Sequence, residues 1–287
     1  MNPFLSVLMT SYNREQYIGE AIESVLASTY TNWELIIVDD GSKDKTVAIA
    51  HEYAAADSRI RVYINEQNLG DYKNRNKAAS LATGEYIMYV DSDDKILKDG
   101  FERCIHAMQQ FPEANFGMQL HGEEQKPFFR KPVEAIEEHF FKRPFLTIGP
   151  GGTIIRRSFF ESLDRYPVVY GPANDMYFNL KAAAAGGVLS LPFTFNFYRI
   201  HEGQELNNKY SYLYNNFNYL RDALQQLNLP LSVKQKEWIQ NKNRRRFLTN
   251  LLRYSFTTGN LRKAVKACQL ARFGWYDLWK AIVHPSL

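Results

Sequence analysis

Residues 86–94 read Tyr-Ile-Met-Tyr-Val-Asp-Ser-Asp-Asp, an apolar run typical of a buried β-strand that ends in three carboxylates. Carboxylates packed this closely repel one another. A divalent cation such as Mg²⁺ or Mn²⁺ neutralises them and leaves coordination positions open for phosphate oxygens. The segment therefore predicts a metal site at the carboxyl end of a strand, in an enzyme that acts on a phosphorylated ligand.

The chain before this segment alternates between strand and helix patterns. Strand patterns lie at 4–10, 33–38 and 61–64, and helical patterns lie at 15–27, 43–54 and 71–81. Four strands alternating with three helices imply parallel pairing through right-handed crossovers, and such sheets bind ligands at the carboxyl ends of their strands. Thr10, Asp39, Asp40 and Asp91 fall at those ends.

Beyond residue 99 the pattern is looser. The polar stretch from His121 to Pro144 is interpreted as a loop over the site, and the chain from Glu205 onward is interpreted as helical, with a break at Leu229-Pro230. Helices are predicted at 101–110 and 174–185, and strands at 115–120, 153–155 and 188–199.

Composition supports a globular protein with a full core, since 45% of the 287 residues are hydrophobic. No apolar run is long enough to span a bilayer, and the first residues lack the basic start of a signal peptide. Cys104 and Cys268 match no metal or redox spacing. A cytoplasmic location is expected.

Charge is distributed unevenly along the chain. Residues 231–287 hold 12 Lys or Arg and two acidic residues, a local charge of +10, whereas the rest holds 23 basic and 29 acidic residues, a charge of −6. Basic charge beside aromatic and aliphatic residues favours a helix lying on an anionic membrane surface. Helices packed on the rest of the protein with solvated basic faces are the alternative. Nucleic acid is not expected as a partner, because no base-reading module precedes the tail.

Four segments together resemble the family 2 glycosyltransferases of GT-A fold, in family order and with family spacing. They are Ser-Val-Leu-Met-Thr-Ser-Tyr-Asn at 6–13, Glu-Leu-Ile-Ile-Val-Asp-Asp-Gly-Ser at 34–42, Arg75-Asn76, and residues 84–94. The resemblance implies an α/β, Rossmann-like fold with a mostly parallel sheet flanked by helices and a helical C-terminal extension. It also implies a catalytic domain at 1–205, with a nucleotide-binding half at 1–99 and an acceptor and catalytic-base half at 100–205, followed by a basic helical region at 206–287.

The family resemblance implies inverting, metal-dependent transfer of a sugar from a nucleotide sugar, here a UDP-sugar, to a glycan or lipid-linked hydroxyl in surface polysaccharide biosynthesis. Mn²⁺ or Mg²⁺ is the implied cofactor, and peripheral binding to the inner face of the membrane would suit such an acceptor. Carried over position by position, the family's nucleotide pocket corresponds to Thr10, Tyr12, Asp40, Arg75 and Asp91. In this assignment Tyr12 stacks on the base, Asp40 accepts a hydrogen bond from it, and Asp91 meets the ribose.

The metal and the catalytic base are implied in the same way. Asp93 corresponds to the metal ligand, with Ser92 and Asp94 beside it in the motif. The stretch from Tyr198 to Gln204 resembles the family's Tyr-Arg-x-His signature, so His201 would complete the metal shell or contact the diphosphate, supported by Arg199. Asp175 corresponds to the general base, although Asn174 stands where the family usually has Glu.

Other readings of these residues stay open at this stage. Asp175 as a helix cap, His201 as a structural hydrogen-bonding group and the 39–42 segment as an ordinary turn are each compatible with the sequence. A magnesium-dependent phosphohydrolase of haloacid dehalogenase type also uses Asp-x-Asp after a strand, but after the first strand. A non-catalytic nucleotide-sugar binding protein is a third hypothesis, whose sign would be loss of the Asp175 carboxylate.

Overall fold

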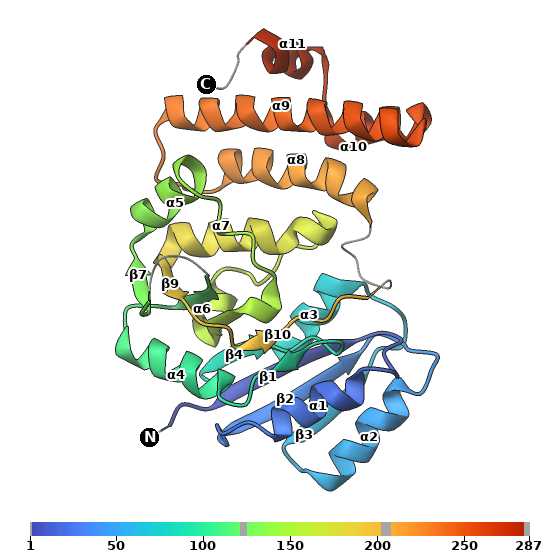
Figure 1. The fold of residues 1–287 in the computed structure, drawn as a ribbon, viewed down its shortest axis with the longest axis vertical. Coiled ribbons are helices and arrows are strands. Elements are labelled where there is room, and N and C mark those ends of the chain that lie inside the picture. Colours follow the sequence, from blue (N-terminus) through green and yellow to red (C-terminus); the bar gives the residue numbers. More distant parts are fainter. Residues whose placement is uncertain (1, 121–124, 202–207, 284–287) are drawn as a thin grey trace.

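The computed structural model describes residues 2–120, 125–201 and 208–283. An eight-stranded sheet in the order β3-β2-β1-β4-β8-β6-β9-β7 runs through it, and β5 pairs with β10 separately (Figure 1). The strands are β1 Leu5–Ser11, β2 Trp33–Asp39, β3 Ile60–Ile64, β4 Tyr86–Tyr89, β5 Lys95–Ile96, β6 Phe116–Gln119, β7 Phe128–Arg130, β8 Thr153–Arg156, β9 Val188–Leu191 and β10 Asn196–Phe197.

The first half of the sheet is parallel, as the sequence predicts. β1 lies between β2 and β4, and β3 continues from β2, all in parallel. Every residue of β2 is buried, because helices cover both faces of the sheet. The helices of this half are α1 Ile18–Leu26, α2 Thr46–Ala56 and α3 Asp71–Ser80.

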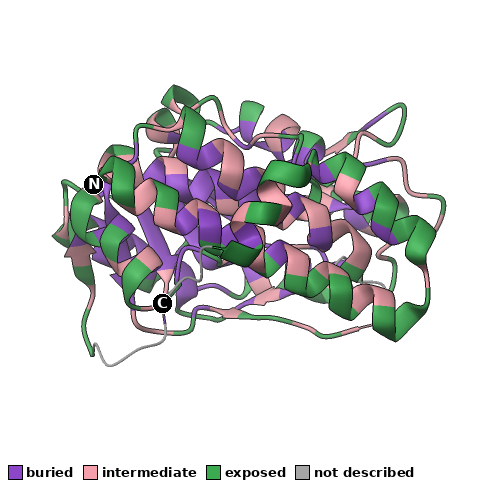
Figure 2. Ribbon diagram, turned by 90° about the horizontal axis from the view of Figure 1, so that it is seen from above, coloured by how far each residue is buried: buried purple, intermediate pink, exposed green. Residues whose placement is uncertain are grey.

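Residues of β1 alternate between two apolar cores, one on each face of the sheet. Val7 and Met9 pack with α1 and α4, whereas Leu8 packs on the other face with side chains of α3 and α7. Buried residues accordingly concentrate in the strands and on the inner sides of the helices (Figure 2). The remaining helices before residue 201 are α4 Gly100–Gln110, α5 Pro132–Phe141, α6 Arg157–Ser162 and α7 Asn174–Gly186, with short 3₁₀ turns η1 Pro150–Gly152 and η2 Gly171–Ala173.

The second half of the sheet is mixed and corrects two sequence predictions. The segment predicted as a loop from His121 to Pro144 contains β7, antiparallel to β9, and α5. Pro132 does not break α5 but occupies its first turn, where a missing N–H costs nothing. Residues 121–124 of the predicted loop lie outside the described residues.

The predicted strand at 188–199 is also wrong as a single element. It divides into β9 and β10, and Pro192 follows β9 directly. Proline has no N–H to donate to a ladder, so the strand ends there. β10 instead pairs antiparallel with β5, which brings the 196–201 segment next to the Asp91–Asp94 turn.

The C-terminal region is helical, as predicted, and the break at Leu229-Pro230 separates its first two helices. α7, α8 and α9 stack as successive layers, with α11 on the outer side of α9 (Figure 1). The predicted domain boundary at 205 lies outside the described residues, and among those described no helix is both long and apolar enough to cross a membrane. The helices are α8 Lys209–Gln226, α9 Val233–Thr258, α10 Leu261–Ala271 and α11 Trp275–Val283.

Candidate active site

A cavity of about 890 Å³ opens at the carboxyl ends of β1, β2 and β4. Eight of the eleven residues singled out from the sequence line it: Thr10, Tyr12, Asp40, Arg75, Asp91, Ser92, Asp93 and Asp175. The other three are Asp94, Arg199 and His201. Arg199 and His201 contact Asp93 directly, and Asp94 accepts a hydrogen bond from Arg199 N. Parallel strands bring their carboxyl ends to one edge, so segments 80 residues apart in the chain meet there.

The wall predicted to bind the nucleotide is formed by the ends of β1 and β2. Tyr12 is 44% exposed, which leaves its ring open to contact from the cavity. Asp40 is buried, and its carboxylate accepts hydrogen bonds from Asn65 Nδ2 (2.7 Å), Leu69 N (2.8 Å) and Gly70 N (2.9 Å). Asp40 therefore fixes the loop before α3. Its predicted bond to a base stays a prediction.

Arg75 links α3 to the end of β4. Its guanidinium bonds Asp71 Oδ1 at 2.8 Å and Asp91 Oδ1 at 2.6 Å, and it is almost fully buried. Burial alone would lower the pKa of Arg75, but the two carboxylates outweigh it and hold the pKa well above its usual value. A permanent cation thus sits in the cavity wall, where it fixes one oxygen of Asp91.

Asp93 lies between two basic groups. Arg14 Nε donates to Asp93 Oδ2 at 2.8 Å, and His201 Nε2 lies 3.0 Å from the same oxygen. Burial alone would raise the pKa of Asp93, but the hydrogen bond with His201 and the charge of Arg14 outweigh it and lower the pKa. Asp93 is therefore held ionised, as a cation ligand must be.

The segment carrying His201 is held against α1. Tyr17 stacks on the His201 ring, with the two ring centroids 4.9 Å apart. The Arg199 guanidinium also lies over the Tyr17 ring, with Cζ 5.0 Å from the ring centroid. Arg199 also donates from Nη2 to Glu20 and from Nε to the carbonyl oxygen of Asp93. These contacts orient the imidazole toward Asp93.

Asp94 has a structural role instead of facing the cavity. It is buried and accepts a hydrogen bond from Arg199 N at 2.9 Å. Burial, with repulsion from Asp91 and Asp93, raises the pKa of Asp94 to about 7. The carboxylates of the acidic turn therefore differ in role. Asp91 and Asp93 face the cavity, and Asp94 holds the 196–201 segment in place.

Asp175 begins α7 on another wall of the cavity. It is 8% exposed, and its Oδ1 accepts a hydrogen bond from Met176 N at 2.7 Å. Burial raises the pKa of Asp175 to about 7, which is where a general base works best at neutral pH. The preceding Asn174 bonds Tyr170 N and the Gly171 carbonyl, so this departure from the family's usual Glu shapes the turn that presents Asp175.

Sequence reasoning missed several cavity residues, among them Arg14, Ser211 and Tyr212. Arg14 follows the quoted 6–13 segment directly, and a basic side chain just beyond a strand end could have been singled out. Ser211 and Tyr212 in the first turn of α8 also line the cavity, and nothing in the sequence signals their position. The C-terminal region is thus part of the site.

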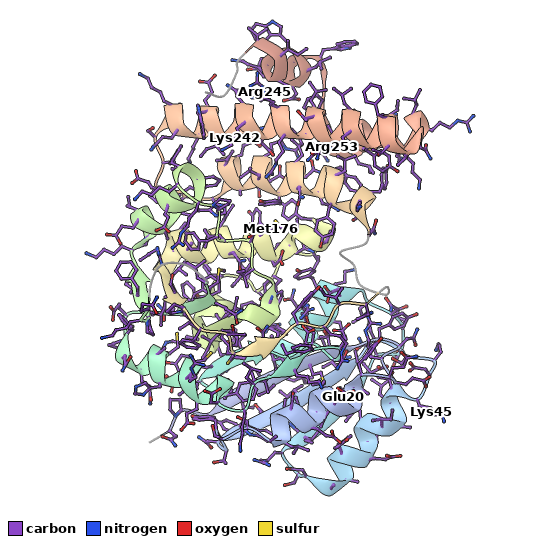
Figure 3. The ribbon with its side chains drawn as sticks, in the orientation of Figure 1. Glu20, Lys45, Met176, Lys242, Arg245 and Arg253 are labelled. Atoms are coloured by element: carbon purple, nitrogen blue, oxygen red, sulfur yellow. The ribbon has the colours of Figure 1, made fainter. Side chains whose placement is uncertain are left out.

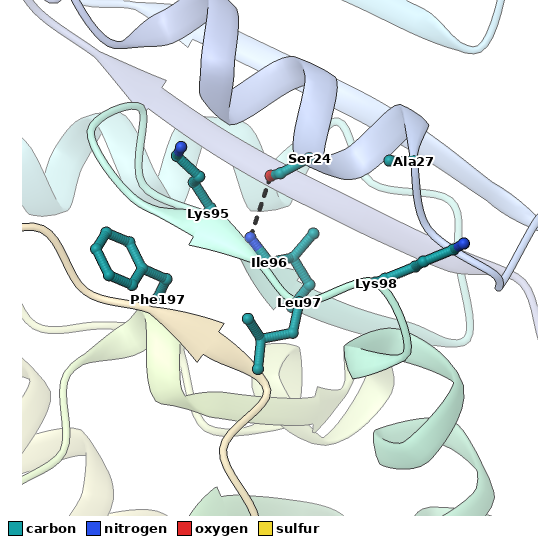
Figure 4. A pocket seen from close by; sticks show the side chains of 7 residues that line it. All are labelled: Ser24, Ala27, Lys95, Ile96, Leu97, Lys98 and Phe197. Carbon is teal, nitrogen blue, oxygen red and sulfur yellow. Dashed lines mark hydrogen bonds between the residues drawn. The ribbon is translucent and has the colours of Figure 1, made fainter.

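A second cavity of about 400 Å³ lies between α1 and the β5–β10 ribbon (Figure 4). Its lining is mainly apolar, with Lys95 and Lys98 at its edge, and no carboxylate lines it. Ile96 N donates to Ser24 Oγ at 3.1 Å across it. Without acidic groups it does not offer the chemistry of a cation and phosphate site.

Comparison with known proteins identifies the family. The profile described as glycosyl transferase family 2 matches residues 6–164, more than half of the chain. The chain therefore belongs to glycosyl transferase family 2. Its fold is of GT-A type, and the phosphohydrolase hypothesis is not supported.

Individual relatives agree with this assignment. The putative teichuronic acid biosynthesis glycosyltransferase TuaG of Bacillus subtilis is 43% identical over 108 residues, which cover 38% of this chain and 43% of TuaG. The chain thus spans less than half the length of the curated relatives it matches.

Two solved structures share the fold. S. aureus TarS 1–349 in complex with UDP-GlcNAc has a TM-score of 0.67 and 22% identity over 97% of this chain and 78% of TarS. The mannosyltransferase PcManGT from Pyrobaculum calidifontis, in complex with GDP-Man and Mn²⁺, has a TM-score of 0.63 and 14% identity over 98% and 84% of the two chains.

Proposed function

We propose that this chain is a metal-dependent, inverting glycosyltransferase that moves a sugar from a UDP-sugar to a hydroxyl of a glycan or lipid-linked acceptor in surface polysaccharide biosynthesis. One observation carries the proposal. Asp93, held ionised between two basic groups, and Asp175, with a pKa of about 7, line the same cavity. Leaving-group stabilisation and general-base chemistry are thereby provided on different walls of one space.

The nucleotide side of this proposal rests on residues 1–99. Tyr12 offers a partly exposed ring on which a base can stack, an interaction of about 1–3 kcal/mol. Arg14 and Arg75 place two guanidinium groups in the cavity, and guanidinium groups match diphosphate oxygens in charge and geometry. The structure of TarS in complex with UDP-GlcNAc supports a UDP-sugar by analogy of fold.

Asp93 and His201 are the residues that would hold Mn²⁺ or Mg²⁺. A carboxylate oxygen and an imidazole nitrogen 3.0 Å apart form a donor pair that suits Mn²⁺. Within the described parts of the chain no group of three or more His, Cys, Asp or Glu side chains is arranged to hold a metal ion. A cation held by these two residues would take its remaining ligands from phosphates and water. When bound, the cation would supply positive charge to the departing diphosphate.

Asp175 is the residue that would accept the proton. The acceptor hydroxyl gives its proton to the Asp175 carboxylate, its oxygen bonds to the anomeric carbon, and the bond from that carbon to the diphosphate oxygen breaks with inversion. Nucleoside diphosphate leaves with the bonding electron pair. Arg14 and Arg75 line the same cavity and would stabilise the charge that develops on the diphosphate.

The acceptor side rests on residues 100–205 together with the helical region from 206. Thr147 and Gly149 line the cavity near Asp175, and Ser211 and Tyr212 of α8 extend the wall. In the proposed division into two catalytic halves and a C-terminal region, the C-terminal region would therefore contact the acceptor as well. The similarity to TuaG, a putative teichuronic acid biosynthesis glycosyltransferase, supports a polymeric carbohydrate product.

The test compares Asp93→Ala, Asp175→Asn and a control, Asp164→Asn. The Asp164 side chain is 93% exposed and has positive φ, which Asn tolerates. UDP binding is measured by calorimetry with and without Mn²⁺, and UDP release from UDP-sugars is measured with a panel of glycosides and with water. Asp93→Ala should abolish the metal-dependent part of UDP binding, whereas Asp175→Asn should keep binding and lower turnover by roughly 10²–10⁴-fold.

Wild-type turnover in Asp175→Asn would contradict the assignment of the base. Equal UDP affinity of the wild type and Asp93→Ala in the presence of Mn²⁺ would contradict the assignment of the metal ligand. Asp164→Asn should match the wild type in both assays, because its carboxylate is remote from the cavity lining.

A further inference from the structure

α10 turns its small residues inward and its large apolar residues outward. Ala264, Ala267 and Ala271 are buried against the neighbouring helices, whereas Leu261 is 69% exposed and Val265 is 59% exposed. Residues four apart lie on one helix face, so Leu261 and Val265 form an outward apolar stripe. This is the reverse of a surface helix of a soluble protein, whose large apolar residues face the core.

α11 shows the same reversal with aromatic residues. Its inward side carries Ala281 and Asp277, and Asp277 Oδ1 accepts a hydrogen bond from Arg244 Nε of α9 at 2.7 Å. Trp275 is 87% exposed, and Tyr276, Trp279 and Ile282 are each more than half exposed on the opposite side. α11 packs on α9, whereas α10 packs on both α8 and α9, and a short turn at 272–274 brings the C-terminal end of α10 beside the N-terminal end of α11.

The residues around these stripes are basic. Arg253, Arg262, Lys263, Lys266 and Arg272 are all exposed. The one acidic residue between 252 and 283, Asp277, is already paired with Arg244. Lys242, Arg245 and Arg253 continue the basic character along α9 (Figure 3). Glu237 of α9 pairs with Lys280 of α11, and the surface otherwise combines aromatic and aliphatic side chains with an excess of positive charge.

We infer that α10 and α11 form a docking face for an anionic lipid bilayer. The apolar face, defined as Leu261, Val265, Trp275, Tyr276, Trp279 and Ile282, enters the headgroup region, and the surrounding Arg and Lys side chains contact lipid phosphates. Trp and Tyr are favoured at that depth because one part of each ring system is apolar and another is polar. This inference stands independently of the proposed function, since none of these six residues is among those that line the candidate active site.

Charge favours a lipid surface over a second copy of the chain. A symmetric dimer through this face would bring the five exposed basic residues of each copy toward those of the other, since a two-fold interface pairs each patch with itself. Lipid phosphates instead supply the missing negative charge. Both signals, apolar insertion and basic contact, are present on the same helices, and stable attachment without a covalent lipid needs both.

The full chain is tested by co-sedimentation with phosphatidylcholine vesicles that either contain or lack phosphatidylglycerol. We expect at least about tenfold stronger partitioning onto the anionic vesicles, falling as salt is raised. The triple variant Trp275→Ser/Trp279→Ser/Ile282→Ser should lose binding at any salt concentration. The triple variant Arg262→Gln/Lys263→Gln/Lys266→Gln should lose most of the preference for phosphatidylglycerol.

A matched control carries Lys43→Gln/Lys45→Gln/Lys98→Gln, three exposed lysines outside the C-terminal helices, and should bind vesicles as the wild type does. All substituted side chains are exposed, and unchanged thermal unfolding and UDP affinity would confirm intact folding. Equally poor retention on both vesicle types overturns the inference. So does concentration-dependent dimerisation, seen by sedimentation velocity, that the tryptophan variant abolishes while vesicles retain neither protein.

Discussion

The proposed chemistry depends on Asp175, and two opposing features of its surroundings set the pKa of its carboxyl group. Burial in the cavity wall disfavours its ionised form and raises its pKa to about 7. Met176 N, at the start of α7, donates to its Oδ1 at 2.7 Å and favours the ionised form. The result is a carboxylate basic enough to accept a proton, yet still ionised in a useful fraction of molecules at neutral pH.

Activity should therefore depend on pH through this carboxyl group. Below about pH 7 the protonated form predominates, so kcat/KM should fall by about tenfold per pH unit on the acid side and level off above pH 7. UDP release from the UDP-sugar, followed from about pH 5 to about pH 9, checks this. UDP affinity measured over the same range separates effects on donor binding from effects on the base.

The Asp164→Asn control should show the same profile as the wild type. A flat profile between about pH 5 and pH 7 would mean that a group with an ordinary carboxyl pKa performs the step, and Asp175 would lose its assigned role.

At the scale of elements, the α8 helix joins the C-terminal region to the site. Its N-cap Asn208 accepts from Ser211 N, which fixes the first turn, and Ser211 and Tyr212 in that turn line the cavity. Tyr212→Ala should raise the KM for the acceptor by roughly fivefold, about 1 kcal/mol of lost contact, and leave UDP affinity unchanged. Initial rates with the acceptor found in the panel, together with UDP calorimetry, give both quantities.

Tyr276→Ala is the matched control, because it removes a tyrosine ring from α11, outside the cavity. Loss of UDP affinity in Tyr212→Ala, or an equal rise in KM in Tyr276→Ala, would show that α8 does not form the acceptor wall.

Some helices and strands can be predicted from the sequence better than others. The parallel strands near residues 4–10 and 33–38 are buried on both faces, so their continuous apolar runs identify them directly. β7 and β10 have only three and two residues and exist through pairing with β9 and β5, which local patterns cannot show. The α5 helix cannot be recognised from its proline, because proline is common both in loops and in the first turn of helices.

The residues of the candidate site also differ in how well their positions can be predicted from the sequence. Asp91 and Asp93 are two positions apart and follow a strand, so their convergence with Thr10 and Tyr12 follows from the topology alone. Arg14 and Tyr212 reach the cavity by tertiary packing, and Tyr17 acts by stacking on a residue 184 positions away. Asp94 faces the 196–201 segment, although its place in the motif is equivalent to that of Asp93.

At the scale of the whole molecule, the same carboxyl group couples activity to stability. Asp175 has a folded-state pKa of about 7, above its value in the unfolded chain. Between about pH 4 and pH 7 the folded protein therefore binds more protons than the unfolded chain, and stability falls as pH rises through this window. Above about pH 7 the cost of ionising a buried carboxyl group is fully present, as is usual where a strained site serves function.

Asp175→Asn should remove that cost together with activity. Its Tm should exceed that of the wild type at about pH 8 by an amount corresponding to a few kcal/mol, and the difference should vanish toward about pH 4, where both states of the wild type are protonated. Scanning calorimetry of the two proteins across this range measures the difference. Asp164→Asn should show no such pH-dependent gain, since its carboxylate is exposed. Equal Tm values of wild type and Asp175→Asn at every pH would mean that Asp175 ionises without penalty, and the raised basicity proposed for catalysis would be lost with it.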